Sequence, residues 1–227
     1  MNWLDDLKTL KLPPLSKGKH QSPEDGLCAM EMVAYLERLP HSDAPECTCL
    51  LLSEYVVKIN DVCSDSDREK LKPYLPRLVG TVSPAHEQAR AEIFAWAAIH
   101  RFAPMALEQV GLRDDAELLR SCPKFEDVFN AISAIIETYS SGPSGTAQVA
   151  GVYEALRAAW SAAEYARISA FEATTYAAVC AMEAAAAGVA NVLDVALEVL
   201  DEAINVGPSG GWTNYSTERA RELERAN

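Results

Sequence analysis

Chemically versatile side chains gather in one short turn of the chain. His41, Ser42, Asp43, Cys47 and Cys49 all fall within nine consecutive positions. A histidine titrates close to neutral pH and can exchange protons, while imidazoles and thiolates are also good metal ligands. The turn is therefore the place where a catalytic, binding or metal site would be expected.

A zinc site is one chemical interpretation, with His41, Cys47, Cys49 and Cys63 as ligands. The spacing is poor, because a Cys-x-Cys pair in a helix points its side chains about 200° apart. Structural zinc sites usually separate paired cysteines by about two to four residues. We therefore expect no metal ion and no cofactor.

Catalysis through His41 is a second interpretation. A cysteine nucleophile, Cys28 or Cys47, could use this histidine as its base, but the sequence around them has no protease or transferase signature. A hydrolase that acts on a nucleotide-like substrate would instead pair His41 with Asp43 or Glu31 for acid–base chemistry. Lone thiols are usually packing residues, so the sequence favours binding over catalysis.

Non-catalytic binding of a small ligand is the interpretation that uses the most polar residues. Arg77 and Lys72 suit phosphate groups, while carboxylates accept hydrogen bonds from amines and ribose hydroxyls. Ser42 or Asp43 could alternatively cap the next helix, and an exposed charge often forms only a weak ion pair. The predicted ligand-binding residues are Glu31, His41, Ser42, Asp43, Asn60, Lys72, Arg77 and Thr81.

Composition narrows the classes of partner. The formal net charge is -13, which does not favour a DNA or RNA partner, because nucleic acid binding needs a basic face. The N-terminus has two aspartates where a signal peptide is basic, and Glu183, Asn191 and Asp194 interrupt the most apolar stretch. We expect a cytoplasmic protein without a membrane span, with its six cysteines reduced.

The elements that must position these residues are helices. Half of the residues are apolar but only 7% are aromatic, and the alanine that makes up the difference favours helices. The fold class is therefore predicted to be all-α. Periodicity, proline and glycine positions predict helices within residues 26–39, 46–62, 64–81, 83–103, 105–120 and 124–139, the third of them broken by prolines.

An alanine-rich half follows the flexible sequence SSGPSG at 140–145. From Thr146 to Ala187 there are 42 residues without proline, 17 of them alanine; as one continuous helix they would extend about 63 Å. Alanine faces let helices approach closely, which predicts a hairpin or bundle that also forms a homo-oligomer. The predicted organisation is an extended N-terminal arm (1–24), an N-terminal helical domain carrying the polar turn (25–140), long alanine-rich helices (146–205) and a polar tail (206–227).

The segment DGLCAMEMVAYLERLPHSDAPECTCLLLSEYVVKINDV, followed by DREKLKPYLPRLVGT, resembles a family of all-helical bacterial and phage proteins without an assigned activity. The family shares a GxCxMExVAYL, PHSDxPxC and PYLPRLVGT block, and the likeness covers residues 25 to about 205. It implies that the polar turn is the functional location. Because phages encode proteins that sequester the nucleotide messengers of bacterial immunity, the resemblance also implies sequestration of a small nucleotide-derived signal. The alternatives are the His41 hydrolase and a helical protein–protein interaction module.

Overall fold

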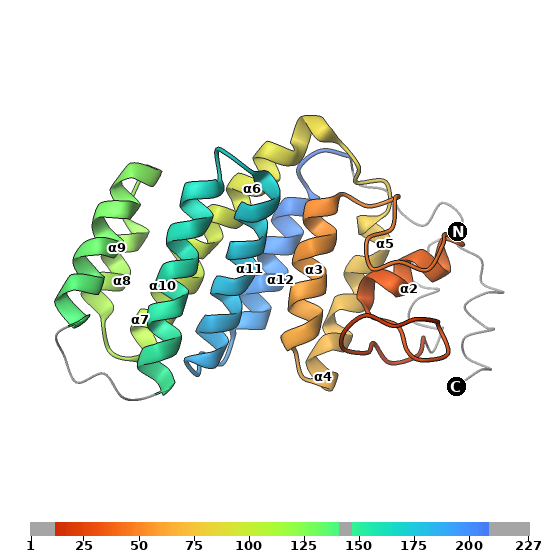
Figure 1. The fold of residues 1–227 in the computed structure, drawn as a ribbon, viewed down its shortest axis with the longest axis horizontal. Helices are drawn as coiled ribbons and strands as arrows, with labels where there is room; N and C mark the ends of the chain where they lie inside the picture. Colours follow the sequence, from red (N-terminus) through yellow and green to blue (C-terminus); the bar gives the residue numbers. More distant parts are fainter. Residues whose placement is uncertain (1–11, 141–146, 209–227) are drawn as a thin grey trace. The chain divides into compact units, whose positions relative to one another are not determined.

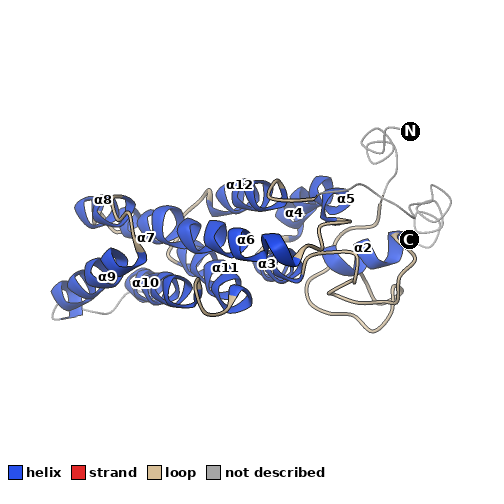
Figure 2. Ribbon diagram, turned by 90° about the horizontal axis from the view of Figure 1, so that it is seen from above, coloured by secondary structure: helices blue, strands red, loops and turns tan. Residues whose placement is uncertain are grey.

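Helices and loops make up the structure. The computed structural model describes residues 12–140 and 147–208, and within these ranges there is no strand (Figures 1 and 2). The predicted all-α fold is confirmed. None of the described helices combines the length and the apolar character that crossing a membrane requires.

The chain divides into two compact units, Met1–His86 with Leu200–Asn227, and Glu87–Val199. The predicted boundary near residue 140 therefore lies within the second unit. The SSGPSG joint, apart from Ser140, and the tail beyond residue 208 lie outside the described residues.

The first unit contains the helices that surround the polar turn. They are α2 (Ala29–Leu36), α3 (Leu50–Val62), α4 (Asp65–Arg68), the 3-10 helix η1 (Glu69–Tyr74) and α5 (Leu75–Leu78). The apolar stripes of α2 and α3 are buried, with Leu36, Leu52 and Val56 fully enclosed. Burying such side chains contributes roughly 1.5–3 kcal/mol each, which favours this packing over isolated helices.

The α3 helix begins later than the sequence predicts. Its first residue is Leu50, because Pro45 and Thr48 form a separate turn in which the Thr48 N–H donates to Pro45 O over 3.1 Å. Cys49 is therefore the N-cap residue. The expectation that Ser42 or Asp43 caps this helix is wrong, since both lie well before its start.

The second unit is a helical bundle. Its elements are α6 (Pro84–Ala97, which starts in the first unit), the π-helix η2 (Ala98–Phe102), α7 (Ala103–Gln109), α8 (Arg113–Arg120), α9 (Phe125–Ser140), α10 (Ala147–Tyr165), α11 (Ala170–Ala186) and most of α12 (Val192–Ile204). Their packed residues are mainly alanine, and Phe94, Ile99 and Phe102 are among the large side chains that are fully buried.

The predicted helix end before Pro104 is wrong. Helical structure runs from α6 through η2 into α7, and Pro104 lies in the first turn of α7. The Ala103 N–H donates to Ala98 O, a π-type bond. A π-turn changes the hydrogen-bonding register, which allows a residue without an N–H to be accommodated in a continuing helix.

The alanine-rich segment forms a hairpin. α10 and α11 run side by side (Figure 1), and the chain turns between them at residues 166–169, where the Ser169 hydroxyl accepts from the Glu172 N–H. The segment is therefore not one continuous 42-residue helix. Of the predicted alternatives, a hairpin or a bundle, these two helices form a hairpin, with its turn at a place that the sequence did not predict.

Close approach of the two helices depends on Gly151. A Cβ atom built on this glycine would lie 3.0 Å from Ala187 N and 3.2 Å from Glu183 O. Both neighbours are backbone atoms, so neither can rotate away as a side chain would. The hairpin therefore leaves no room for a branched side chain here.

We predict that Gly151→Val destabilises the protein by about 2 kcal/mol, because overpacking against backbone forces the helices apart. The midpoint of urea unfolding, followed by circular dichroism, measures the change. Ala150→Val is the matched control, since Ala150 is exposed on the same helix. Equal midpoints for the two variants would contradict the close-approach argument.

Candidate functional site

The centre of the polar turn is the buried carboxylate of Glu31. Its oxygens accept from the His20 N–H at 2.7 Å, from the Cys28 N–H at 2.8 Å and from His20 Nδ1 at 2.7 Å. Burial alone would raise the pKa of this carboxyl, but the hydrogen bonds from Cys28 and His20 together lower it below the usual value. Glu31 is therefore ionised at neutral pH.

The position of Glu31 follows from local helix chemistry. Cys28 is the N-cap of α2 and Glu31 is its third helical residue, so the two form a capping box. The Glu31 N–H donates to Cys28 Sγ at 3.4 Å while the carboxylate returns to the Cys28 N–H. Reciprocal caps of this kind satisfy two otherwise unpaired helix donors.

Two histidines flank the carboxylate. His20 comes from the arm, and His41 comes from the turn after α2, where its Nε2 lies 3.4 Å from Glu31 Oε1. The same nitrogen donates to His20 O at 2.9 Å. The structure thus brings the predicted residues Glu31 and His41 together, and adds His20.

The other ring nitrogen of His41 is left with an unused bonding capacity. Because Nε2 donates to a carbonyl, it carries the hydrogen, so Nδ1 of the neutral ring is an acceptor. Nδ1 is buried and has no hydrogen-bond partner. Such an atom is costly unless something donates to it, and either a water molecule or a ligand that donates to Nδ1 would relieve that cost.

Asn60 and Arg68 join the arm to α3. The Asn60 side chain accepts from the Ala29 N–H at 3.2 Å and donates to Ser16 O at 2.9 Å. The buried Arg68 donates to Asn60 O, and also to Leu15 O at 3.2 Å. The predicted residue Asn60 therefore serves to hold the arm against the first two helices.

Lys72, Arg77 and Thr81 have intramolecular partners of their own. Lys72 donates to Leu12 O at 3.2 Å and forms an ion pair with Glu69. Thr81 Oγ1 accepts from the Cys49 N–H at 2.9 Å, which satisfies the start of α3.

Arg77 reaches the C-terminal part of the first unit. It forms an ion pair with Asp201, donates from Nη2 to Asn205 Oδ1 at 3.1 Å, and stacks over the Tyr74 ring. These contacts fix the end of α12 against η1 and α5. These contacts occupy guanidinium N–H groups of Arg77 that were predicted to bind phosphate.

Ser42 and Asp43 lie on the outer side of the turn. Ser42 Oγ accepts from the Ala44 N–H at 3.0 Å, and Asp43 forms an ion pair with Lys19 at 2.9 Å. The hydrogen bond and attraction of Asp43 raise the pKa of Lys19. The ion pair is largely exposed, and exposed pairs of this kind are weak, so a ligand can displace it.

Among the residues that the structure describes, the cysteines near the turn are not gathered into a group of possible metal ligands. Cys49 and Cys63 cap opposite ends of α3, about 20 Å apart along the helix at 1.5 Å per residue. Burial raises the pKa of Cys28 to about 12 and that of Cys47 to about 11. Both free thiols are protonated at neutral pH, whereas a nucleophilic cysteine acts as a thiolate.

Residues 17–20, which were predicted to lie in the extended N-terminal arm, are part of the site. His20 contacts Glu31 directly, and the Gly18 N–H donates to Asp61 Oδ1 at 2.8 Å. Gly26 has a φ of 130°, and an added Cβ would lie 2.9 Å from His20 Nε2. Gly26 was the sequence feature that could have indicated this contact, because a glycine at this backbone angle lets the arm pack closely against the start of α2.

Comparison of the chain with protein-family models, curated proteins and solved structures finds no match.

We predict that Glu31→Gln destabilises the first unit by about 3 kcal/mol at pH 7, because three donors lose an ionised acceptor. Since the folded pKa of Glu31 is lowered, its stabilisation is present above the ordinary value near 4.5 and is lost as the pH falls through the folded value. Unfolding curves from pH 7 to 3 should therefore converge for variant and wild type. The exposed Glu24→Gln serves as the control and should show no such pH-dependent difference.

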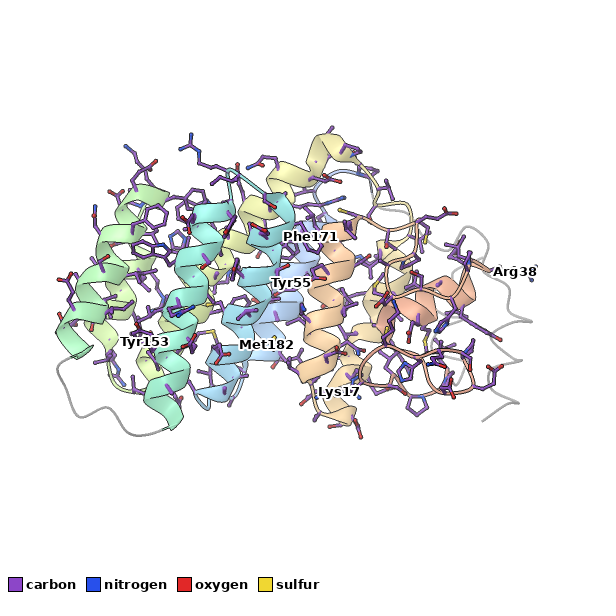
Figure 3. The ribbon with its side chains drawn as sticks, viewed as in Figure 1. Lys17, Arg38, Tyr55, Tyr153, Phe171 and Met182 are labelled. Carbon is purple, nitrogen blue, oxygen red and sulfur yellow. The ribbon has the colours of Figure 1, made fainter. Side chains whose placement is uncertain are left out.

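A second prediction concerns Arg38, which follows α2 with a φ of 60° and extends into solvent (Figure 3). Left-handed backbone is unfavourable for a residue with a Cβ atom, so Arg38→Gly should stabilise the protein by about 0.5–1 kcal/mol. Thermal unfolding measures the shift. Arg38→Ala keeps the Cβ and should give no increase; a similar gain for both variants would point to charge as the cause.

Proposed function

We propose that this protein binds and sequesters a small nucleotide-derived ligand at the polar turn, without converting it. The observation that supports this function is the buried, unpartnered Nδ1 of His41. The ring is held from behind by Glu31 and by His20 O, so its free lone pair has a fixed direction. A fixed acceptor loses little entropy on binding, which favours tight recognition.

The chemistry of that acceptor suggests which part of a nucleotide it would contact. A lone pair accepts from a hydroxyl or an amine and repels a phosphate oxygen. His41 would therefore read a ribose hydroxyl or an exocyclic base amine, with Ser42 and Asp43 as neighbouring polar groups. Exposed basic residues of the first unit, Lys17 on the arm and Arg38 after α2, lie apart from one another (Figure 3) and would add a general attraction for phosphates, not a shared phosphate site.

A hydrolase is the second candidate, and the same atom favours it. A neutral imidazole whose Nε2–H faces a carboxylate can act as a general base through Nδ1, because the carboxylate stabilises the imidazolium that forms. Here Glu31 would orient His41, and a water molecule would be the nucleophile. The raised pKa values of Cys28 and Cys47 disfavour covalent catalysis.

Calorimetry against cyclic mononucleotides, cyclic dinucleotides and ADP-ribose isomers tests the proposal. We predict that one member binds and that His41→Ala weakens it about tenfold, the cost of one hydrogen bond to a buried acceptor. His86→Ala is the control, because His86 lies in the same unit but bonds to Ser83, and it should bind as the wild type does.

Mass spectrometry of the recovered ligand separates the two candidate functions. An unchanged ligand supports sequestration, and a product whose formation depends on His41 supports the hydrolase. If no member of the panel binds, or if His41→Ala binds normally, the proposed site is wrong. A helical protein-interaction module then becomes the leading account.

A further inference from the structure

A second candidate site lies in the second unit, between the first turns of α9 and the last turns of α10. It is a cavity of about 250 Å³. Phe125, Phe129 and Trp160 contribute aromatic surface, while Glu126, Glu164 and Arg167 are the charged lining residues. The cavity is composed wholly of side chains from the second unit and is separate from the polar turn.

The aromatic wall is held in place from behind. Trp96 stacks on Phe125 with ring centroids 4.4 Å apart and on His100 at 4.6 Å. Phe129 packs on Trp160 at 4.8 Å with the rings tilted by 54°. Because neighbouring rings fix these side chains, the cavity is formed before any ligand arrives, and binding need not order it.

The charge around this wall is negative. Two carboxylates against one guanidinium leave a formal charge of -1 on the lining residues, in a protein whose net charge is -13. Arg167 lies 3.4 Å from Glu126, and both side chains are about 70% exposed, at 73% and 67%. Such an exposed pair is weak and can be opened by a competing ion.

These features together indicate one class of ligand. Aromatic faces carry negative electrostatic potential and attract cations, most strongly for tryptophan. Phe129 and Trp160 pack on each other with their planes tilted by 54°, so they offer an angled aromatic surface and not a parallel slot that would sandwich a flat base, and two carboxylates oppose a phosphate. We propose that this cavity binds a small organic cation of the quaternary ammonium type, with Trp160 and Phe129 contacting the cation and Glu126 and Glu164 balancing its charge.

The inference does not depend on the function proposed for the polar turn. The ligand class is different, the residues are different, and the two sites can be tested separately. His41→Ala, which removes the candidate acceptor of the first site, should leave cation binding unchanged.

Titration of the full chain with choline, followed by the indole N–H resonance of Trp160 in nuclear magnetic resonance spectra, tests the proposal. Trp160→Phe assigns that resonance. We expect a saturable shift with choline and none with its neutral isostere 3,3-dimethyl-1-butanol at the same concentration. Adenosine monophosphate serves as the anionic comparison and should also give no shift.

Charge variants should change the affinity for choline in opposite directions, and calorimetry measures that affinity. Glu164→Gln should weaken binding about threefold to tenfold, since it removes a balancing carboxylate. Arg167→Gln should strengthen binding about twofold or more, because it removes a competing cation. Both residues are exposed, so these variants should fold normally.

Three outcomes would overturn the proposal. Equal binding of choline and its neutral isostere would show an apolar cavity without cation selectivity. Binding of adenosine monophosphate that Arg167→Gln weakens would show an anion site. Absence of a saturable choline shift would show that no cation site exists here.

Discussion

The first unit depends on one buried charge. The carboxylate of Glu31 is completely removed from solvent, and an ionised group in that position is stable only if donors surround it. The structure supplies those donors from the arm and from the start of α2. A requirement of charge solvation therefore brings together segments that the sequence separates, and fixes the ring of His41 beside them.

The same requirement explains why the candidate site was only partly predictable from sequence. Glu31 on the first predicted helix and His41 after the proline expected to end that helix were both assigned to the site from sequence. The Cys28–Glu31 cap was not predicted, because cysteine is not a preferred N-cap residue. The partners of Asn60 and Arg77 could not be predicted, because they lie 44 residues away at Ser16 and 124 residues away at Asp201. A polar residue at a helix end has the same appearance in sequence whether it meets a ligand or a distant backbone atom.

The fold was more predictable, because helix formation is governed by local periodicity and by capping. The start of α6 at Pro84 is one example, and the alanine hairpin of α10 and α11 is another. Errors arose where tertiary packing overrode a local signal. Proline usually ends a helix, but at Pro104 the π-helix η2 lets the helical structure continue into α7. The turn at Ala166–Ser169 contains neither proline nor glycine, so only the capping residue Ser169 marked it.

The two candidate sites differ in what the folded chain leaves unsatisfied. At the polar turn, Nδ1 of His41 has a lone pair that accepts no hydrogen bond, while Nε2 of the same ring donates to His20 O. In the second unit, the cavity has an aromatic wall that lies beside two carboxylates and one guanidinium. A lone pair calls for a hydrogen-bond donor, and a negative aromatic wall calls for a positive charge. Neither by itself suits a phosphate, so the phosphates of a nucleotide bound at the turn would have to be balanced by other, exposed basic residues of the first unit. Discrimination at the turn would then come from the sugar or base edge, while the phosphates would contribute mainly to the salt dependence of the affinity.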